Sequence, residues 1–183
     1  MAVQVIASSY SDGPTLTAAA AASMLPTYVV TTLPAGYFQI GRQWRITMSG
    51  RVSCVVTTPG TFRINLRLGA VTAWDSLAIP LNIVAQTNVP WFGEILLTCR
   101  SVGSGTSATL FGMGRFNSTA FLNVPAVATG PWSGIITVPY NTAPVVGTGF
   151  DSTAANALDM QFTQTVATGS FTLHQMLIEQ LTP

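Results

Sequence analysis

Residues 42–68 alternate apolar and polar side chains over two successive runs. From Trp44 to Val56 almost every second residue is apolar, and the same alternation returns from Phe62 to Leu68. A period of two residues is typical of a strand with one buried face. The Thr-Thr-Pro-Gly sequence between the runs is a turn signal. The sequence therefore predicts two antiparallel strands paired in a hairpin.

Arginines gather in this stretch and occupy polar positions of both runs. The 183-residue chain has seven Lys-plus-Arg residues, all of them arginine, and five lie between residues 42 and 68. In a hairpin, four of them would project from its outward face. Such an arginine bonds a carboxylate or carbonyl of a neighbouring subunit, or is simply solvated. The candidate partner-contact residues are therefore Arg45, Arg51, Arg63 and Arg67.

Further strand-like runs, separated by turn residues, follow this stretch. Residues 91–101 and 107–117 flank a Gly-Ser-Gly turn and predict a second hairpin, in which Gly112 and Gly114 indicate a bulge or a close backbone approach. Residues 134–140 are apolar on both sides, as in a strand buried in a sandwich or against another subunit. Other runs cover residues 27–32, 77–84, 156–166 and 171–181.

The number of runs decides between two all-β architectures. Eight main strands with one long irregular connection fit an eight-stranded antiparallel jelly-roll-like β-sandwich better than a seven-stranded immunoglobulin sandwich. The usual Cys, Trp, Cys spacing of the immunoglobulin sandwich is also missing. We therefore predict an all-β, jelly-roll-like sandwich.

The N-terminal region differs from the rest in carrying a run of alanines. Residues 15–25 contain five consecutive alanines, Thr15 or Thr17 can cap a helix, and Pro26 can end it. We predict an arm over residues 1–26 with a short Ala-rich helix, followed by one sandwich domain over residues 27–183. Small side chains permit close approach of another backbone, so the further candidate interface residues are Ala18, Ala19, Ala20, Ala21 and Ala22.

Charge is scarce along the whole chain. Charged residues make up 7% of the sequence, hydrophobic residues 48%, and the mean hydropathy is +0.45, whereas about a quarter of residues in ordinary soluble domains are charged. No apolar run approaches the ~20 residues that span a bilayer, and residues 1–10 lack signal-peptide features. We expect neither membrane insertion nor signal-directed export. We expect a homo-oligomer that buries the surplus apolar surface; the alternative is a monomer with a neutral, Thr- and Ser-rich surface.

The sequence offers few groups for catalysis or ligand binding. Without lysine there is no Walker lysine or Schiff base, and no Gly-x-Ser-x-Gly elbow supplies a serine for the single histidine, His174. The acidic residues are scattered, and a net charge of +1 without a basic run argues against nucleic-acid binding. We predict no catalytic, metal-binding or cofactor-binding residues and no enzyme. We expect His174 to be a structural residue; a hydrolase built on it is the alternative.

The two cysteines, Cys54 and Cys99, fall on predicted inward-facing positions. A chain that folds in a reducing cytosol keeps such residues as small buried thiols. The alternative is a disulfide, if paired strands bring the two residues together.

Four phrases of the sequence resemble structural proteins of tailed-bacteriophage virions: TLTAAAAASMLP, LPAGYFQIGRQWRITMSGRVSCVVTTPGTFRINLRLG, FGEILLTCRSVGSGTSATLFGMGRF and FTLHQMLIEQL. The resemblance covers residues 15–181 and includes no catalytic or ligand motif. It implies a jelly-roll protein, often trimeric, that is made in the host cytoplasm and lies on the capsid exterior of the virion. As a decoration (cement) protein it would bind the major capsid protein and hold the expanded head shell.

The same resemblance implies an alternative, a phage tail, fibre or head-fibre module that binds host surface glycans. Aromatic side chains in loops at the end of the sandwich would then stack on sugar rings. The candidates for this role are Trp74, Trp91, Trp132 and Tyr140.

Overall fold

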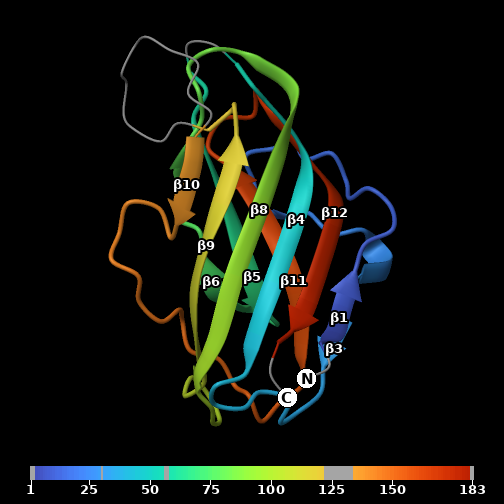
Figure 1. The fold of residues 1–183 in the computed structure, drawn as a ribbon, viewed down its shortest axis with the longest axis vertical. Coiled ribbons are helices and arrows are strands. Elements are labelled where there is room, and N and C mark those ends of the chain that lie inside the picture. The colour runs from blue at the N-terminus through green and yellow to red at the C-terminus, as the bar shows by residue number, and fades with distance from the viewer. Residues whose placement is uncertain (1–2, 30, 56–57, 122–133, 182–183) are drawn as a thin grey trace.

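Two antiparallel β-sheets pack face to face in the computed structural model, which describes residues 3–29, 31–55, 58–121 and 134–181 (Figure 1). Sheet A has the strand order β1-β12-β4-β8-β9-β10. Sheet B has the order β2-β11-β5-β6, with β3 also beside β11 and β7 beside β5. In Figure 1, β12, β4, β8 and β9 form the front layer, and β11, β5 and β6 lie behind them. The prediction of an all-β protein is confirmed.

The described residues form twelve strands, more than the eight expected. Segments such as β2, β3 and β7 are only two or three residues long and have no sequence period of their own. Sheet A contains β1 (Gln4–Ser8), β4 (Gln43–Cys54), β8 (Gln86–Ser101), β9 (Thr109–Ser118), β10 (Gly134–Val138) and β12 (Ser170–Gln180). Sheet B contains β2 (Ala22–Ser23), β3 (Thr31–Leu33), β5 (Thr61–Leu68), β6 (Val71–Asp75), β7 (Ile79–Pro80) and β11 (Asn156–Gln164), and a 3-10 helix, η1, covers Thr27–Val29.

The predicted hairpin over residues 42–68 is wrong, although both of its strands exist. β4 pairs with β12 and β8 in sheet A, whereas β5 pairs with β11, β6 and β7 in sheet B. The chain therefore crosses from one sheet to the other between them, and their apolar rows face each other across the core. Alternation specifies which face of a strand is buried, but it does not specify which strand lies beside it.

The second predicted hairpin is confirmed, because β8 and β9 pair along their length in sheet A. The expected close approach lies at Gly112 of β9, whose carbonyl accepts a hydrogen bond from the indole Nε1 of Trp74 at 3.1 Å. A Cβ at Gly112 would lie 2.5 Å from that indole. Because Trp74 belongs to β6, glycine at this position lets sheet B pack closely on sheet A.

A cluster of aromatic rings joins the two sheets inside the core. Phe171 of β12 stacks on Phe162 of β11 with ring centroids 4.2 Å apart, and on Trp91 of β8 at 4.7 Å. Phe62 of β5 stacks on Phe121 at 4.6 Å. All five side chains are buried. Rings from both sheets are thus in direct contact, which fixes how the sheets pack on each other.

The predicted alanine-rich helix is also wrong, because residues 15–25 form no helix: residues 18–20 are bends, and the residues on either side pair with strands. Leu16 exchanges backbone hydrogen bonds of 2.8 and 2.9 Å with Phe171 of β12. Ala22 of β2 pairs with Phe162 of β11. Backbone groups that a helix would pair internally are paired here with both sheets. Tertiary pairing has overridden the helix propensity of alanine.

β10 forms an edge of sheet A and is buried on one side only within this chain. Ile136 and Val138 point into the core, whereas Ile135 is 57% exposed. The expectation that this run is buried on both sides is therefore not met by the isolated chain.

Both cysteines are buried free thiols, as predicted. Cys54 is the last residue of β4, whereas the amide of Cys99 donates to the carbonyl of Arg42, just before β4 begins. The two thiols therefore lie toward opposite ends of the same strand, which makes the alternative of a disulfide wrong. Burial raises the pKa of both thiols above the ordinary value of 9.0, although backbone hydrogen bonds lower it in part.

Candidate interaction surface

The two sheets present outer faces of different chemistry. Alternate residues of each strand are buried, and the register of the ladders places the outward residues in rows across each sheet. The sheet A face comprises Arg45, Thr47, Ser49, Arg51, Phe92, Glu94, Leu96, Thr98, Arg100, Phe111, Met113, Arg115, Asn117, Ile135, Thr137, Gln175, Leu177 and Glu179. The sheet B face comprises Thr61, Arg63, Asn65, Arg67, Asp75, Ala157, Asp159, Gln161 and Thr163.

Large apolar side chains cluster on the part of the sheet A face formed by β8, β9 and β10. Phe92, Leu96, Met113 and Ile135 are 42%, 45%, 40% and 57% exposed. The ladder places Leu96 beside Met113, and it places both Phe92 and Ile135 beside Asn117. We call these four residues the apolar group. Several exposed large apolar side chains on one face mark a surface that another molecule covers.

The charges in the middle of the sheet A face are paired with each other. Glu94 bonds Arg115 on the neighbouring strand at 3.1 Å, and Arg45 bonds Glu179 at 2.8 Å. By register, the Glu94–Arg115 pair lies between Phe92 and Leu96 along β8. The centre of this face is therefore electrically neutral despite its four charged side chains.

The sheet A face is uneven rather than flat. One shallow hollow is lined by Leu96, Met113, Gly114 and Thr137, together with the paired Glu94 and Arg115. A second hollow is lined by residues of β1, β4, β12 and the β8 residue Phe92. The side chains of β8 thus lie between two depressions, and a partner surface of matching relief can contact apolar atoms on both sides of this strand.

The sheet B face is polar and its arginines bond within the chain. Arg63 donates two hydrogen bonds to Asp75, one of them from Nε at 2.7 Å, and this carboxylate raises the pKa of the Arg63 guanidinium. Arg67 donates to the carbonyl of Ala70 at 2.8 Å and to Gln161 Oε1 at 3.4 Å. Within the described residues, no large hydrophobic side chain is exposed on a strand of sheet B.

The structure does not bring the four predicted arginines together in one patch. Arg45 and Arg51 belong to the sheet A face, whereas Arg63 and Arg67 belong to the sheet B face. Arg51 is exposed, and its guanidinium has no hydrogen bond or ion pair with any other residue that the structure describes. Of the four guanidinium groups, that of Arg51 is the one that remains available for a partner. A role for any of the four in subunit contact stays a prediction.

The five alanines lie on the segment that passes from β12 to β11. Ala18 to Ala21 are exposed and Ala22 is partly buried. Their small side chains leave the backbone of this segment accessible, but their role in subunit contact also stays a prediction.

The apolar group was missed at the level of sequence, although one signal for it exists. In the run that became β8, Phe92 and Leu96 occupy the phase that otherwise carries Glu94, Thr98 and Arg100. Two large apolar residues in the outward phase of an otherwise polar row indicate a strand that is covered on both faces.

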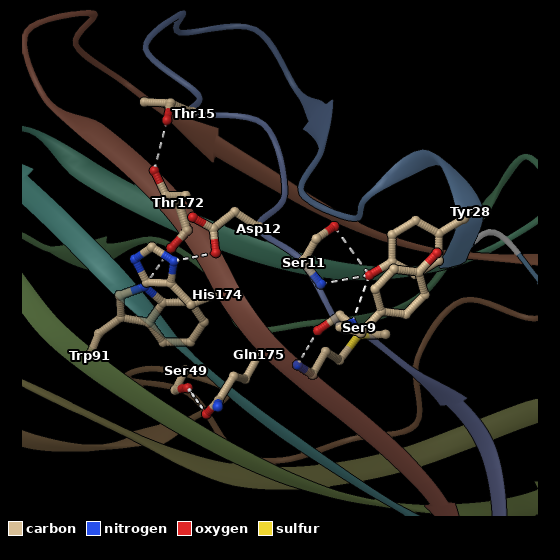
Figure 2. Close-up of polar contacts among 12 residues, drawn as sticks. Ser9, Ser11, Asp12, Thr15, Tyr28, Ser49, Trp91, Thr172, His174 and Gln175 are labelled. Carbon is tan, nitrogen blue, oxygen red and sulfur yellow. Dashed lines mark hydrogen bonds and ion pairs between the residues drawn. The ribbon is translucent and has the colours of Figure 1, made fainter.

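The N-terminal segment is fastened along β12, as Figure 2 shows. Thr15 Oγ1 lies 3.0 Å from Thr172 Oγ1, and Asp12 Oδ1 lies 2.7 Å from Nδ1 of His174. Tyr28 stacks on Tyr10 with ring centroids 4.0 Å apart. These contacts hold the segment against its own sheet.

Hydrogen bonds also tie the phenol of Tyr28 to this segment. Its oxygen accepts from the amides of Tyr10 and Ser11 at 2.7 and 2.8 Å. Slight burial raises the pKa of this phenol, but the hydrogen bonds from Ser11 and Tyr10 outweigh it and lower the pKa overall.

His174 contacts the N-terminal segment rather than a neighbouring strand. It lies where the β12 register shifts between Leu173 and Gln175, and it bonds Asp12 of the N-terminal segment. No hydroxyl group of the described residues is hydrogen-bonded to His174. A structural role for His174 stays a prediction.

Metal ligands, membrane-spanning helices and sugar-binding aromatic residues are three further kinds of functional feature. Across residues 3–29, 31–55, 58–121 and 134–181, no three His, Cys, Asp or Glu side chains gather to hold a metal ion, and no helix is long and apolar enough to span a bilayer. Of the aromatic residues considered for sugar binding, Trp74 and Trp91 are buried and Tyr140 is partly buried. Trp132 lies outside the described residues.

No protein-family model, no curated protein and no solved structure matches this chain. Its function must therefore be inferred from the fold and from the chemistry of its two faces.

Proposed function

We propose that this chain is a structural protein of a tailed-bacteriophage virion, namely a capsid decoration protein that self-associates and stabilises the head shell. The observation that carries the proposal is the contrast between a sheet A face that exposes Phe92, Leu96, Met113 and Ile135 and a sheet B face whose described strands expose no large apolar side chain. The protein would act mechanically and without turnover. It would lie on the capsid exterior as a trimer bound to the major capsid protein, after synthesis in the host cytoplasm.

The strand order supports a jelly roll as the form of the sandwich. β12 lies between β1 and β4 in sheet A, and β11 lies between β2 and β5 in sheet B. The last strands of the chain are thus inserted between early strands in both sheets, an antiparallel wrapping that is typical of jelly rolls. β9 and β10 extend sheet A beyond this arrangement.

The proposed mechanism needs binding energy and a rigid body rather than reactive groups. A protein that binds the assembled shell, and not its separated subunits, stabilises the shell by mass action. The buried aromatic cluster fixes one sheet on the other, so a load applied to one face is transmitted to the opposite face. The scarcity of charge fits a molecule whose surface is largely covered in its working state.

The proposal is tested on virions purified with and without an intact gene for this chain. We expect the chain in wild-type particles at a fixed ratio to the major capsid protein, with antibody labelling on the outside of the heads. Particles without the chain should release DNA at a lower temperature, and added purified protein should restore the original temperature. Absence of the chain from particles would contradict the proposal, and labelling confined to tails would replace it with the fibre module.

A further inference from the structure

We infer that copies of this chain contact one another through the sheet A face, with the apolar group at the centre of the contact. In the oligomer, the sheet A faces of the copies are turned toward their common symmetry axis. This inference rests on the self-association in the proposed function and adds to it the surface that is used and the molecule that covers it. Three properties of the face lead to a second copy as its occupant.

The first property is the size of the face. β4, β8, β9 and β12 are each at least ten residues long, and β1 and β10 add five residues each at the two edges. With a strand spacing of about 4.8 Å and a rise of about 3.3 Å per residue, such a sheet covers roughly 800 Å². That equals the area of about 800 Å² that each partner contributes to a stable protein–protein interface.

The second property is the distribution of charge. Glu94 pairs with Arg115, and Arg45 pairs with Glu179, so each pair is neutral in the central rows. Arg51 and Arg100 have no ion-pair partner within the described residues, and they lie toward the ends of β4 and β8. A strongly acidic or basic partner would find no opposing charge at the centre of this face. A second copy brings the same neutral centre, so the contact creates no repulsion between like charges there.

The third property is the uneven shape of the face. The exposed Phe92 and Leu96 side chains project from β8, and a hollow lies on either side of this strand. The same surface therefore carries both the projections and the depressions that a contact between two copies needs. The sheet B face has no exposed large apolar side chain among its described strands, so it does not offer a comparable contact to a second copy.

The test is sedimentation velocity of the full chain and of charge variants at micromolar concentrations. We expect wild-type protein to be oligomeric. Leu96→Glu and Met113→Glu should each weaken association by roughly 100-fold or more, because each replaces a large apolar side chain in the contact by a carboxylate that must lose its water. The matched control is Thr163→Glu, which adds the same charge to the outward row of β11 in the sheet B face, and it should leave the oligomer unchanged.

Circular dichroism shows whether each variant is folded. The uncharged Leu96→Gln variant should weaken association less than Leu96→Glu does. A monomeric wild-type protein, or dissociation by Thr163→Glu but not by Leu96→Glu, would overturn the inference. A wild-type monomer that still decorates heads overturns this inference and the self-association in the proposed function, but it leaves the binding to heads intact, because the major capsid protein would then cover the face. An oligomer that dissociates as expected but is absent from virions supports the inference and contradicts the proposed function.

Discussion

The outer faces of sheets A and B come from strands with the same alternating pattern, yet among the described strands sheet A exposes several large apolar side chains and sheet B exposes none. In sheet A, the outward positions of β8 and β9 include Phe92, Leu96 and Met113, which are 40% exposed or more. In sheet B, the corresponding positions of β5 carry arginines that bond within the chain. Residues at inward positions must be apolar on both sheets because they form the core. The outward residues are free of that requirement, so a difference between them reflects what each face contacts.

The largest expected effect comes from removing a ring that holds the two faces together. Phe171→Ala opens a cavity between Phe162 of sheet B and Trp91 of sheet A, and we expect the free energy of unfolding to fall by about 3–5 kcal/mol. Urea unfolding followed by fluorescence and by circular dichroism measures the loss. Because the core is shared, both signals should still change in one transition.

The control for this variant is Leu96→Ala, which shortens an exposed side chain on the sheet A face. At a concentration where the protein is monomeric, we expect it to change the free energy of unfolding by no more than about 0.5 kcal/mol. A large loss of monomer stability in Leu96→Ala would mean that the apolar group belongs to the core and is not a contact surface.

A smaller effect separates the arginines of the two faces. Arg51 is the guanidinium without a partner among the described residues, whereas Arg63 bonds Asp75. We expect Arg51→Ala to weaken association by roughly two- to fivefold, the range of an exposed ion pair, and Arg63→Ala to leave association unchanged. Dissociation constants from sedimentation decide the point. If the two substitutions weaken association equally, Arg51 on the sheet A face and Arg63 on the sheet B face do not differ in their role in the contact.

The smallest expected effect is a pH dependence that arises in the core and not in either face. Burial raises the pKa of Cys54 and Cys99 above 9.0. Below that pH both thiols are protonated in the folded and in the unfolded chain, so they add no pH dependence. As pH rises above 9.0, the unfolded chain loses these protons first, and the free energy of unfolding falls.

Urea unfolding under reducing conditions, on either side of that pH, measures the decline. A variant with both Cys54→Ala and Cys99→Ala should show less of it than wild type does. An equal decline in the two proteins would exclude the thiols as its source.

Much of the architecture was predictable because a buried strand face leaves a regular period in the sequence. The inward residues of β4, such as Ile46 and Met48, and the pairing of β8 with β9 both follow from alternation and a short turn. The free cysteines were predictable for the same reason, since inward positions are buried. The close approach at Gly112 was indicated by a glycine within a strand.

The rest depends on contacts between residues far apart in the sequence. The sequence between β4 and β5 is the same whether the two strands pair in a hairpin or the chain crosses from one sheet to the other there. Five alanines favour a helix in isolation, and only the neighbouring edges of β12 and β11 draw that segment into extended pairing. The arginines were assigned to one face because the hairpin was assumed, so the error in pairing carried over to the candidate site. The apolar group becomes visible only when the register places β8 beside β9 and β9 beside β10.

Hydroxyl-radical footprinting of the wild-type chain at several protein concentrations tests most directly whether the sheet A face is where copies meet. Met113 and Phe92 are exposed in the single chain, and Tyr10, 84% exposed and on the N-terminal segment, serves as the internal reference. We predict that oxidation of Met113 and Phe92 falls severalfold relative to Tyr10 as the protein passes from monomer to oligomer. Unchanged oxidation of both residues in a fully oligomeric sample would contradict the assignment of this face.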